Sequence, residues 1–192
     1  SVAQLGFSLM VLIPQSISQV FYIKISTAYG KSGNKSELIY LCNRYTLINV
    51  VCTGAVCVIG YYMLPVFVRI VMPNYVDGIG AAQIMLVGIC IYGSTMLYGN
   101  IFSVLRMNKD LLWTSWILCA FNVVFSIGLV LIVGKHIDNV ALGTSASYAA
   151  YSVVIIFTLS HKFGIKSMNF VKTTWIPLAI MLIPSIAFYY LI

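Results

Sequence analysis

Six stretches of the chain carry no charged side chain, and each is about as long as a helix that crosses a lipid bilayer. They cover residues 1–23, 45–68, 79–105, 111–134, 140–160 and 173–192. About 20 residues span roughly 30 Å of hydrocarbon as a helix. Backbone groups in lipid must pair within their own segment, and these stretches lack the strict alternation of a barrel strand. The sequence therefore predicts an all-α, polytopic transmembrane helix bundle of about six spans.

The composition excludes an ordinary soluble domain. Hydrophobic residues make up 61% of the 192 residues and charged residues 8%, against about 45–50% and about 25% in soluble proteins. No water-soluble fold of this size hides so much apolar surface. We expect a single transmembrane domain over 1–192, and because both ends lie within apolar stretches we expect it to be a fragment of a longer membrane protein.

The polar residues between the stretches set the expected element bounds. The spans are predicted at approximately 1–29, 38–64, 79–105, 111–134, 140–160 and 173–192. The segment 65–72 is too short to cross a bilayer and is bracketed by Pro65 and Pro73. It is therefore predicted to form a short helix in the membrane interface.

Basic residues gather in alternate loops. One side of the membrane receives Lys24, Lys31, Lys35, Arg44, Arg106, Lys109, Lys162, Lys166 and Lys172, and the other receives Arg69 and Lys135. The positive-inside rule places the richer side in the cytosol. Nucleic-acid binding is not expected, because it requires basic residues along one face together with stacking aromatic residues.

No set of residues has the spacing of a catalytic or cofactor site. The four acidic residues fall in predicted loops or at span ends, and no pair is placed to share a site; they are Glu37, Asp77, Asp110 and Asp138. A glycine-rich phosphate loop is also missing. The chain is predicted not to be an enzyme and to bind no cofactor or metal.

Polar side chains within the spans are the candidates for a transport role. Gln15, Ser18, Gln19 and Tyr22 recur at helical spacing, Asn49 lies inside the second span, and Lys24 and Arg44 lie near the cytosolic ends. A cation embedded in a membrane protein marks a candidate site, and a cytosolic pair of cations suits an anionic lipid headgroup. Long cationic side chains also extend to headgroups for purely structural reasons, and amides also join neighbouring helices, so both interpretations stay open.

Several motifs, taken in order, carry a resemblance to a family. They are Pro14-Gln15-Ser16-Ile17-Ser18, Tyr29-Gly30-Lys31-Ser32-Gly33, Glu37-Leu38 and Arg44-Tyr45, then Leu64-Pro65 to Tyr75, Arg106-Met107-Asn108-Lys109, Asn122, and Ala141-Leu142-Gly143-Thr144-Ser145-Ala146-Ser147. Their order and spacing resemble the C-terminal half of polysaccharide flippases in the multidrug/oligosaccharidyl-lipid/polysaccharide exporter superfamily.

The resemblance implies a bacterial inner-membrane flippase, in which this chain is one lobe of a two-lobe exporter. Its substrates would be undecaprenyl-diphosphate-linked oligosaccharide repeat units for O-antigen, capsule or exopolysaccharide, moved from the cytosolic to the external leaflet. Lys24 and Arg44 would meet the diphosphate, with Gln15, Gln19 and Asn49 lining the path. The expected partners are this lipid-linked oligosaccharide, membrane lipids and the missing N-terminal half of the protein.

Three other functions compete with the flippase. A multidrug/cation antiporter of the same superfamily needs a membrane-embedded carboxylate for ion coupling, and the six stretches contain none. A membrane enzyme of polysaccharide assembly is expected to show a long external loop with paired polar residues, whereas the longest external segment here is the short 65–78 region. A membrane scaffold does not explain the polar stripe on the first span.

Overall fold

Helix accounts for nearly all of the residues that the structure describes, as expected where backbone groups must pair within apolar segments. The computed structural model describes residues 2–134, 137–163 and 171–191, and no strand occurs within these ranges. The elements are α1 (Val2–Ser32), α2 (Lys35–Val71), the 3₁₀ helix η1 (Pro73–Gly78), α3 (Ile79–Val104), α4 (Asn108–Val133), α5 (Ile137–Phe163), the π-helical turn η2 (Val171–Trp175) and α7 (Ile176–Leu191). The prediction of an all-α fold is confirmed.

Four segments of the described chain are long and apolar enough to cross a membrane. They are Lys35–Val71, Pro73–Val104, Asn108–Val133 and Ile137–Phe163. These segments match the second to fifth predicted spans, so the apolar helices are compatible with a membrane protein. The assignment of α1 and α7 as spans stays a prediction, and so does the total of six.

Pro65 does not end a helix, so the predicted separate helix over 65–72 is wrong. Instead, α2 continues from Lys35 to Val71 with Pro65 inside it, and the second predicted span, 38–64, is longer than expected. A proline cannot donate to the carbonyl four residues earlier, here that of Tyr61. Nε2 of Gln83 on α3 donates to this carbonyl at 3.2 Å. The neighbouring helix supplies the missing donor, which is how membrane helices tolerate an internal proline.

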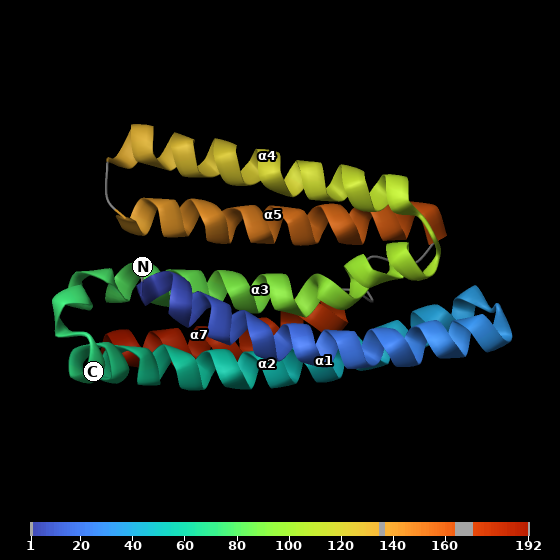
Figure 1. The fold of residues 1–192 in the computed structure, drawn as a ribbon, viewed down its shortest axis with the longest axis horizontal. Coiled ribbons are helices and arrows are strands. Elements are labelled where there is room, and N and C mark those ends of the chain that lie inside the picture. Colours follow the sequence, from blue (N-terminus) through green and yellow to red (C-terminus); the bar gives the residue numbers. More distant parts are fainter. Residues whose placement is uncertain (1, 135–136, 164–170, 192) are drawn as a thin grey trace.

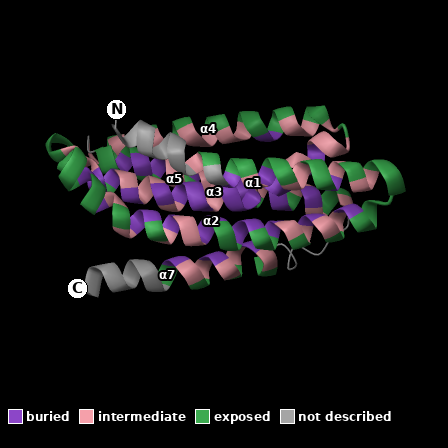
Figure 2. Cartoon of the chain, turned by 60° about the horizontal axis from the view of Figure 1, so that its bottom comes forward, coloured by how far each residue is buried: buried purple, intermediate pink, exposed green. Residues whose placement is uncertain are grey.

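α3 lies at the centre of the bundle (Figure 1) and packs against α1, α2 and α5. α4 packs mainly on α5, and α7 packs on α2. Burial is concentrated on α3, whereas the outer face of α4 is exposed (Figure 2). The largest buried side chains include Leu97, Tyr98 and Phe102 of α3. The core of this bundle is therefore organised around one helix.

Small residues allow the helices to approach closely, as is typical of membrane bundles. A Cβ at Gly143 of α5 would lie 2.7 Å from Cα of Ser126 on α4. A Cβ at Gly93 of α3 would lie 3.0 Å from Cβ of Pro14 and 3.3 Å from Cγ2 of Thr53. The backbones of α5 and α4 are in near contact at Gly143, whereas at Gly93 an added methyl group would crowd the side chains of Pro14 and Thr53.

Polar side chains join the helices at several levels. Nδ2 of Asn100 donates to Oγ of Ser18 at 3.1 Å, linking α3 to α1. Thr95 and Ser152 share a hydrogen bond of 3.2 Å between α3 and α5. Lys162 near the end of α5 forms an ion pair with Asp110 in the first turn of α4. These contacts favour the interpretation of many polar groups within the apolar helices as links between helices.

The connections sort to the two ends of the bundle (Figure 1). The α1–α2 turn, the α3–α4 connection and the end of α5 lie together at one end, and η1 and the start of α5 lie at the other. The first end carries the described residues of the basic group, and Arg69 lies near the second. Lys135 and Lys166 lie outside the described residues. The assignment of the basic end to the cytosol stays a prediction.

Candidate functional site

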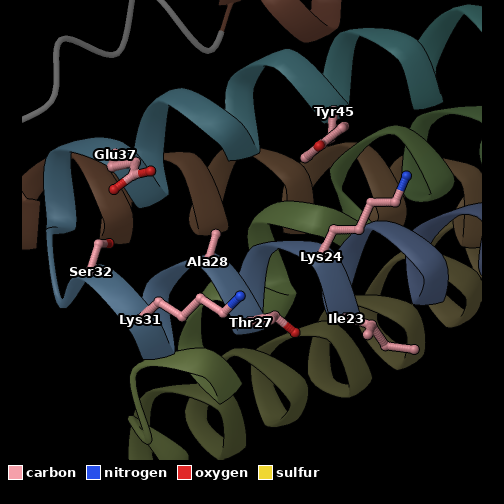
Figure 3. Close-up of a pocket in the computed structure, with 8 residues that line it drawn as sticks. All are labelled: Ile23, Lys24, Thr27, Ala28, Lys31, Ser32, Glu37 and Tyr45. Carbon is pink, nitrogen blue, oxygen red and sulfur yellow. The ribbon is translucent and has the colours of Figure 1, made fainter.

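An open cavity of about 570 Å³ lies between the last turns of α1 and the first turns of α2, at the basic end of the bundle (Figure 3). Its lining residues are Ile23, Lys24, Thr27, Ala28, Lys31, Ser32, Glu37 and Tyr45. The volume falls in the usual range of small-molecule sites, about 300–1,000 Å³. The mixture of cationic, hydroxyl and apolar groups makes this cavity the candidate site.

Helical periodicity brings the polar residues of α1 to the cavity. Lys24, Thr27 and Lys31 stand at i, i+3 and i+7, and positions with this spacing share one helix face. Glu37 and Tyr45 lie across the cavity on α2 (Figure 3). The site is therefore a two-helix arrangement in which α1 supplies both cations.

A tight turn sets the geometry of this hairpin. Gly33 follows the last residue of α1 with a φ of 61°, a left-handed conformation that favours glycine. Its N–H donates to the carbonyl of Tyr29 at 2.8 Å, which closes the end of α1. Asn34 then caps α2, because its Oδ1 accepts a hydrogen bond of 3.0 Å from the N–H of Ser36. The turn holds the two polar helix faces next to each other.

Packed apolar residues support the cavity from within the bundle. The ring of Tyr45 stacks on Phe21 with centroids 4.5 Å apart and an interplanar angle of 16°. Ile25 and Leu38 are buried, with 2% and 1% of their surfaces exposed. Because these contacts hold α1 against α2, the cavity keeps a defined wall on its inner side.

The cavity is electropositive. Two lysines and one glutamate line it, and all three are exposed. Within the described part of the chain, neither lysine forms an ion pair, since the ion pair found joins Lys162 to Asp110. Lys24 and Lys31 are therefore available to an anion, and hydroxyl groups of Thr27, Ser32 and Tyr45 lie around them.

The predicted site residues are only partly brought together. Lys24 lines the cavity, but Arg44 does not; it is exposed on α2. Gln15 and Gln19 are exposed farther back on α1 and do not line the cavity either. Asn49 is fully buried. The polar stripe of α1 is also divided, because Ser18 is buried against Asn100 while the two glutamines point outward.

Asn49 makes a structural contact through its amide nitrogen, while its Oδ1 is buried without a hydrogen-bond partner among the described residues. Its Nδ2 donates to the carbonyl of Gly93 at 2.8 Å, at the point where α2 crosses α3. Replacing Asn49 by Ala is expected to lower the free energy of unfolding by about 1–2 kcal/mol, from the lost hydrogen bond and the cavity left behind. Thermal unfolding of the purified protein measures this effect. If the chain has the transport function expected from the sequence, transport per folded molecule stays unchanged in this variant, and a selective loss of transport would instead support a role of Asn49 in substrate binding.

Several lining residues of the site were not predicted from the sequence. Lys31 was assigned to a loop, but α1 continues about two turns beyond Lys24 and includes Lys31. The spacing of seven residues between the two lysines, with Thr27 between them, was the signal that predicts a shared face. The contribution of Glu37 and Tyr45 depends on the fold of the hairpin and had no signal in the spacing.

Because comparisons with known proteins found no match, the site is interpreted from its own residues. No protein-family model, no curated protein and no solved structure matches this chain.

Proposed function

We propose that the chain is part of a transporter that moves a lipid-linked, diphosphate-bearing oligosaccharide across the bilayer of a bacterial inner membrane. The observation that carries this proposal is the electropositive cavity of Lys24 and Lys31 at the basic end of the bundle. In this function the chain is the C-terminal lobe of a two-lobe flippase, and its substrate is an undecaprenyl-diphosphate-linked repeat unit for a surface polysaccharide.

The chemistry of the cavity suits each part of such a substrate. A diphosphate is a concentrated anion, and charge-assisted hydrogen bonds from lysines to phosphate are among the stronger polar contacts. Hydroxyls of Thr27, Ser32 and Tyr45 match sugar hydroxyls, which both donate and accept hydrogen bonds. Because the cavity is open, the prenyl chain can remain in the lipid while the polar head enters.

Exposed polar groups on α1 and α2 support a second lobe. Gln15 and Gln19 are exposed on α1, and Arg44 is exposed on α2. Polar side chains facing hydrocarbon are costly, and in membrane proteins they face a bundle interior or a water-filled path. A path between this lobe and another provides that environment, with the three residues lining it beyond the cavity.

The rival antiporter function has less support. Ion coupling calls for a carboxylate inside the membrane. Glu37, Asp110 and Asp138 lie in the first turns of α2, α4 and α5, and Asp77 lies in η1. The acidic residues thus occupy helix ends.

Neutralising the cavity lysines tests the proposed function. Lys24→Gln and Lys31→Gln in the full-length protein are each expected to lower polysaccharide export roughly tenfold, because each removes one charge-assisted contact to the diphosphate. Export is measured as surface polysaccharide in cells that carry only the variant, at matched protein levels. The lipid-linked precursor is expected to accumulate on the inner leaflet.

Lys35→Gln is the matched control. Lys35 starts α2 beside the same turn and loses the same charge, but it does not line the cavity. Export with this variant is expected to stay near the wild-type level. Equal export by all three variants would refute the role of the cavity.

A further inference from the structure

A second open cavity, of about 600 Å³, lies on the outer face of α4, away from the α1–α2 site. Its lining residues are Lys109, Leu112, Trp113, Trp116, Ile117 and Ala120. Positions 109, 113, 116, 117 and 120 follow helical spacing, so they form one stripe along the first three turns. Both indoles are prominent on the surface, each with 69% of its area exposed. We call this stripe the α4 groove.

Among the four described segments long and apolar enough to cross a membrane, α4 is the least buried. Thr114 is the one buried residue of α4. The helix packs mainly on α5. The stripe continues into Val124, Ile127 and Leu131, which are all exposed. An uninterrupted apolar surface of this kind is solvated by lipid chains without cost. The α4 groove is therefore open to the bilayer along its length.

The groove begins at a cation and continues as an apolar surface. Lys109 lies in the first turn of α4, where the helix dipole also favours an anion. The nearby carboxylate of Asp110 is already paired with Lys162, and Arg106 just before the helix is exposed. The local charge is thus positive, and Trp113 and Trp116 follow within the next two turns of α4. Tryptophans in membrane proteins are enriched at headgroup depth.

We propose that the α4 groove binds an anionic phospholipid, with the phosphate on the Lys109 ammonium and an acyl chain along Trp113, Trp116 and Ile117. The inference does not depend on the proposed transport function. Charge complementarity identifies the headgroup, because a basic end of a membrane protein attracts anionic lipids. The indole rings supply a rigid surface for the glycerol backbone and the upper part of the chain.

A lipid fits this face better than a second protein helix. Helix–helix contacts in membranes use small residues that let backbones approach, as at Gly143 and Gly93 of this chain. The α4 groove instead presents two tryptophans together with Leu112 and Ile117. Such an irregular surface leaves gaps against another helix but is filled by a flexible acyl chain.

Native mass spectrometry of the full-length protein tests the proposal, with phosphatidylglycerol and phosphatidylcholine as the two lipid probes. Wild type is expected to retain phosphatidylglycerol in preference to phosphatidylcholine. Lys109→Gln is expected to weaken phosphatidylglycerol binding about fivefold, since one basic residue at the membrane surface contributes about that factor. Trp113→Leu is expected to weaken the binding of both lipids. Lys172→Gln, which removes an exposed lysine outside the groove, is the control and is expected to bind like wild type.

A photo-crosslinking amino acid at position 116 of the full-length protein, expressed in cells, separates the two kinds of occupant. Crosslinks to phospholipid are expected. Crosslinks to another part of the same protein, or to a second protein, would overturn the proposal, as would unchanged phosphatidylglycerol binding in both groove variants. Lipid binding and crosslinking at α4 do not depend on polysaccharide export. The lipid proposal and the proposed transport function can therefore be refuted separately.

Discussion

Gly143→Ala is expected to lower the free energy of unfolding by about 2–3 kcal/mol. The added Cβ would lie 2.7 Å from Cα and 2.8 Å from N of Ser126, so it meets the backbone of α4. A side chain can rotate away from such a contact, but a helix backbone has to move as a unit. Because packing drives helix association in lipid, separating α4 from α5 removes much of what holds α4.

The measurement is thermal unfolding of the purified full-length protein in detergent, where this loss corresponds to a fall in Tm of roughly 5–10 °C. Gly128→Ala is the matched control, because Gly128 lies on α4 and a Cβ there meets nothing within 4 Å. That variant is expected to keep or slightly raise Tm, since Ala favours helix over Gly. Equal Tm values for the two variants would contradict the close α4–α5 contact.

Reversing both cavity charges, with Lys24→Glu and Lys31→Glu together, is expected to reduce export to background. Under the proposed function, the double variant loses two charge-assisted contacts, worth roughly 3–6 kcal/mol, and adds repulsion against the diphosphate. The corresponding fall in export exceeds about a hundredfold. The measurement is surface polysaccharide, together with the amount of folded protein in the membrane.

Charge reversal at this end of the bundle also affects insertion, so the control must change the net charge equally. Lys35→Glu combined with Lys172→Glu makes the same change at two exposed residues that do not line the cavity. If the positive-inside effect alone matters, both double variants lose export together with correct insertion. A loss confined to the cavity pair, at normal protein level, is the expected result.

Much of the fold was predictable because long apolar segments restrict the choice of secondary structure. Apolar stretches of bilayer length have to be helical, and the structure has helices across all the predicted spans it describes. The error at 65–72 arose from treating Pro65 as a helix end. The donor that replaces its missing N–H comes from Gln83, eighteen residues farther along the chain, and depends on the packing of α3 against α2. A local rule cannot predict a partner that a neighbouring helix supplies.

The candidate site was predicted in part. The wrong predictions also arose because contacts between helices cannot be derived from one segment of the sequence. Lys24 was identified because a cation at the edge of an apolar span is conspicuous in any sequence. Asn49 was grouped with it by residue type alone, yet it is fully buried and bonded to Gly93. A polar residue in a helix is chemically the same whether it faces a path or a neighbouring helix, and only the packing distinguishes the two.

The sequence by itself determined the helices, the apolar surface and the segregation of basic residues to one end, because hydropathy and the pairing of backbone groups act over a single segment. Tertiary structure decided which polar residues meet. It brought Lys24 and Lys31 opposite Glu37 and Tyr45 and left Arg44, Gln15 and Gln19 on outer faces. The physical reason is that the rotation of each helix is set by close contacts with its neighbours, such as those at Gly93 and Gly143, and these contacts are formed between segments far apart in the chain.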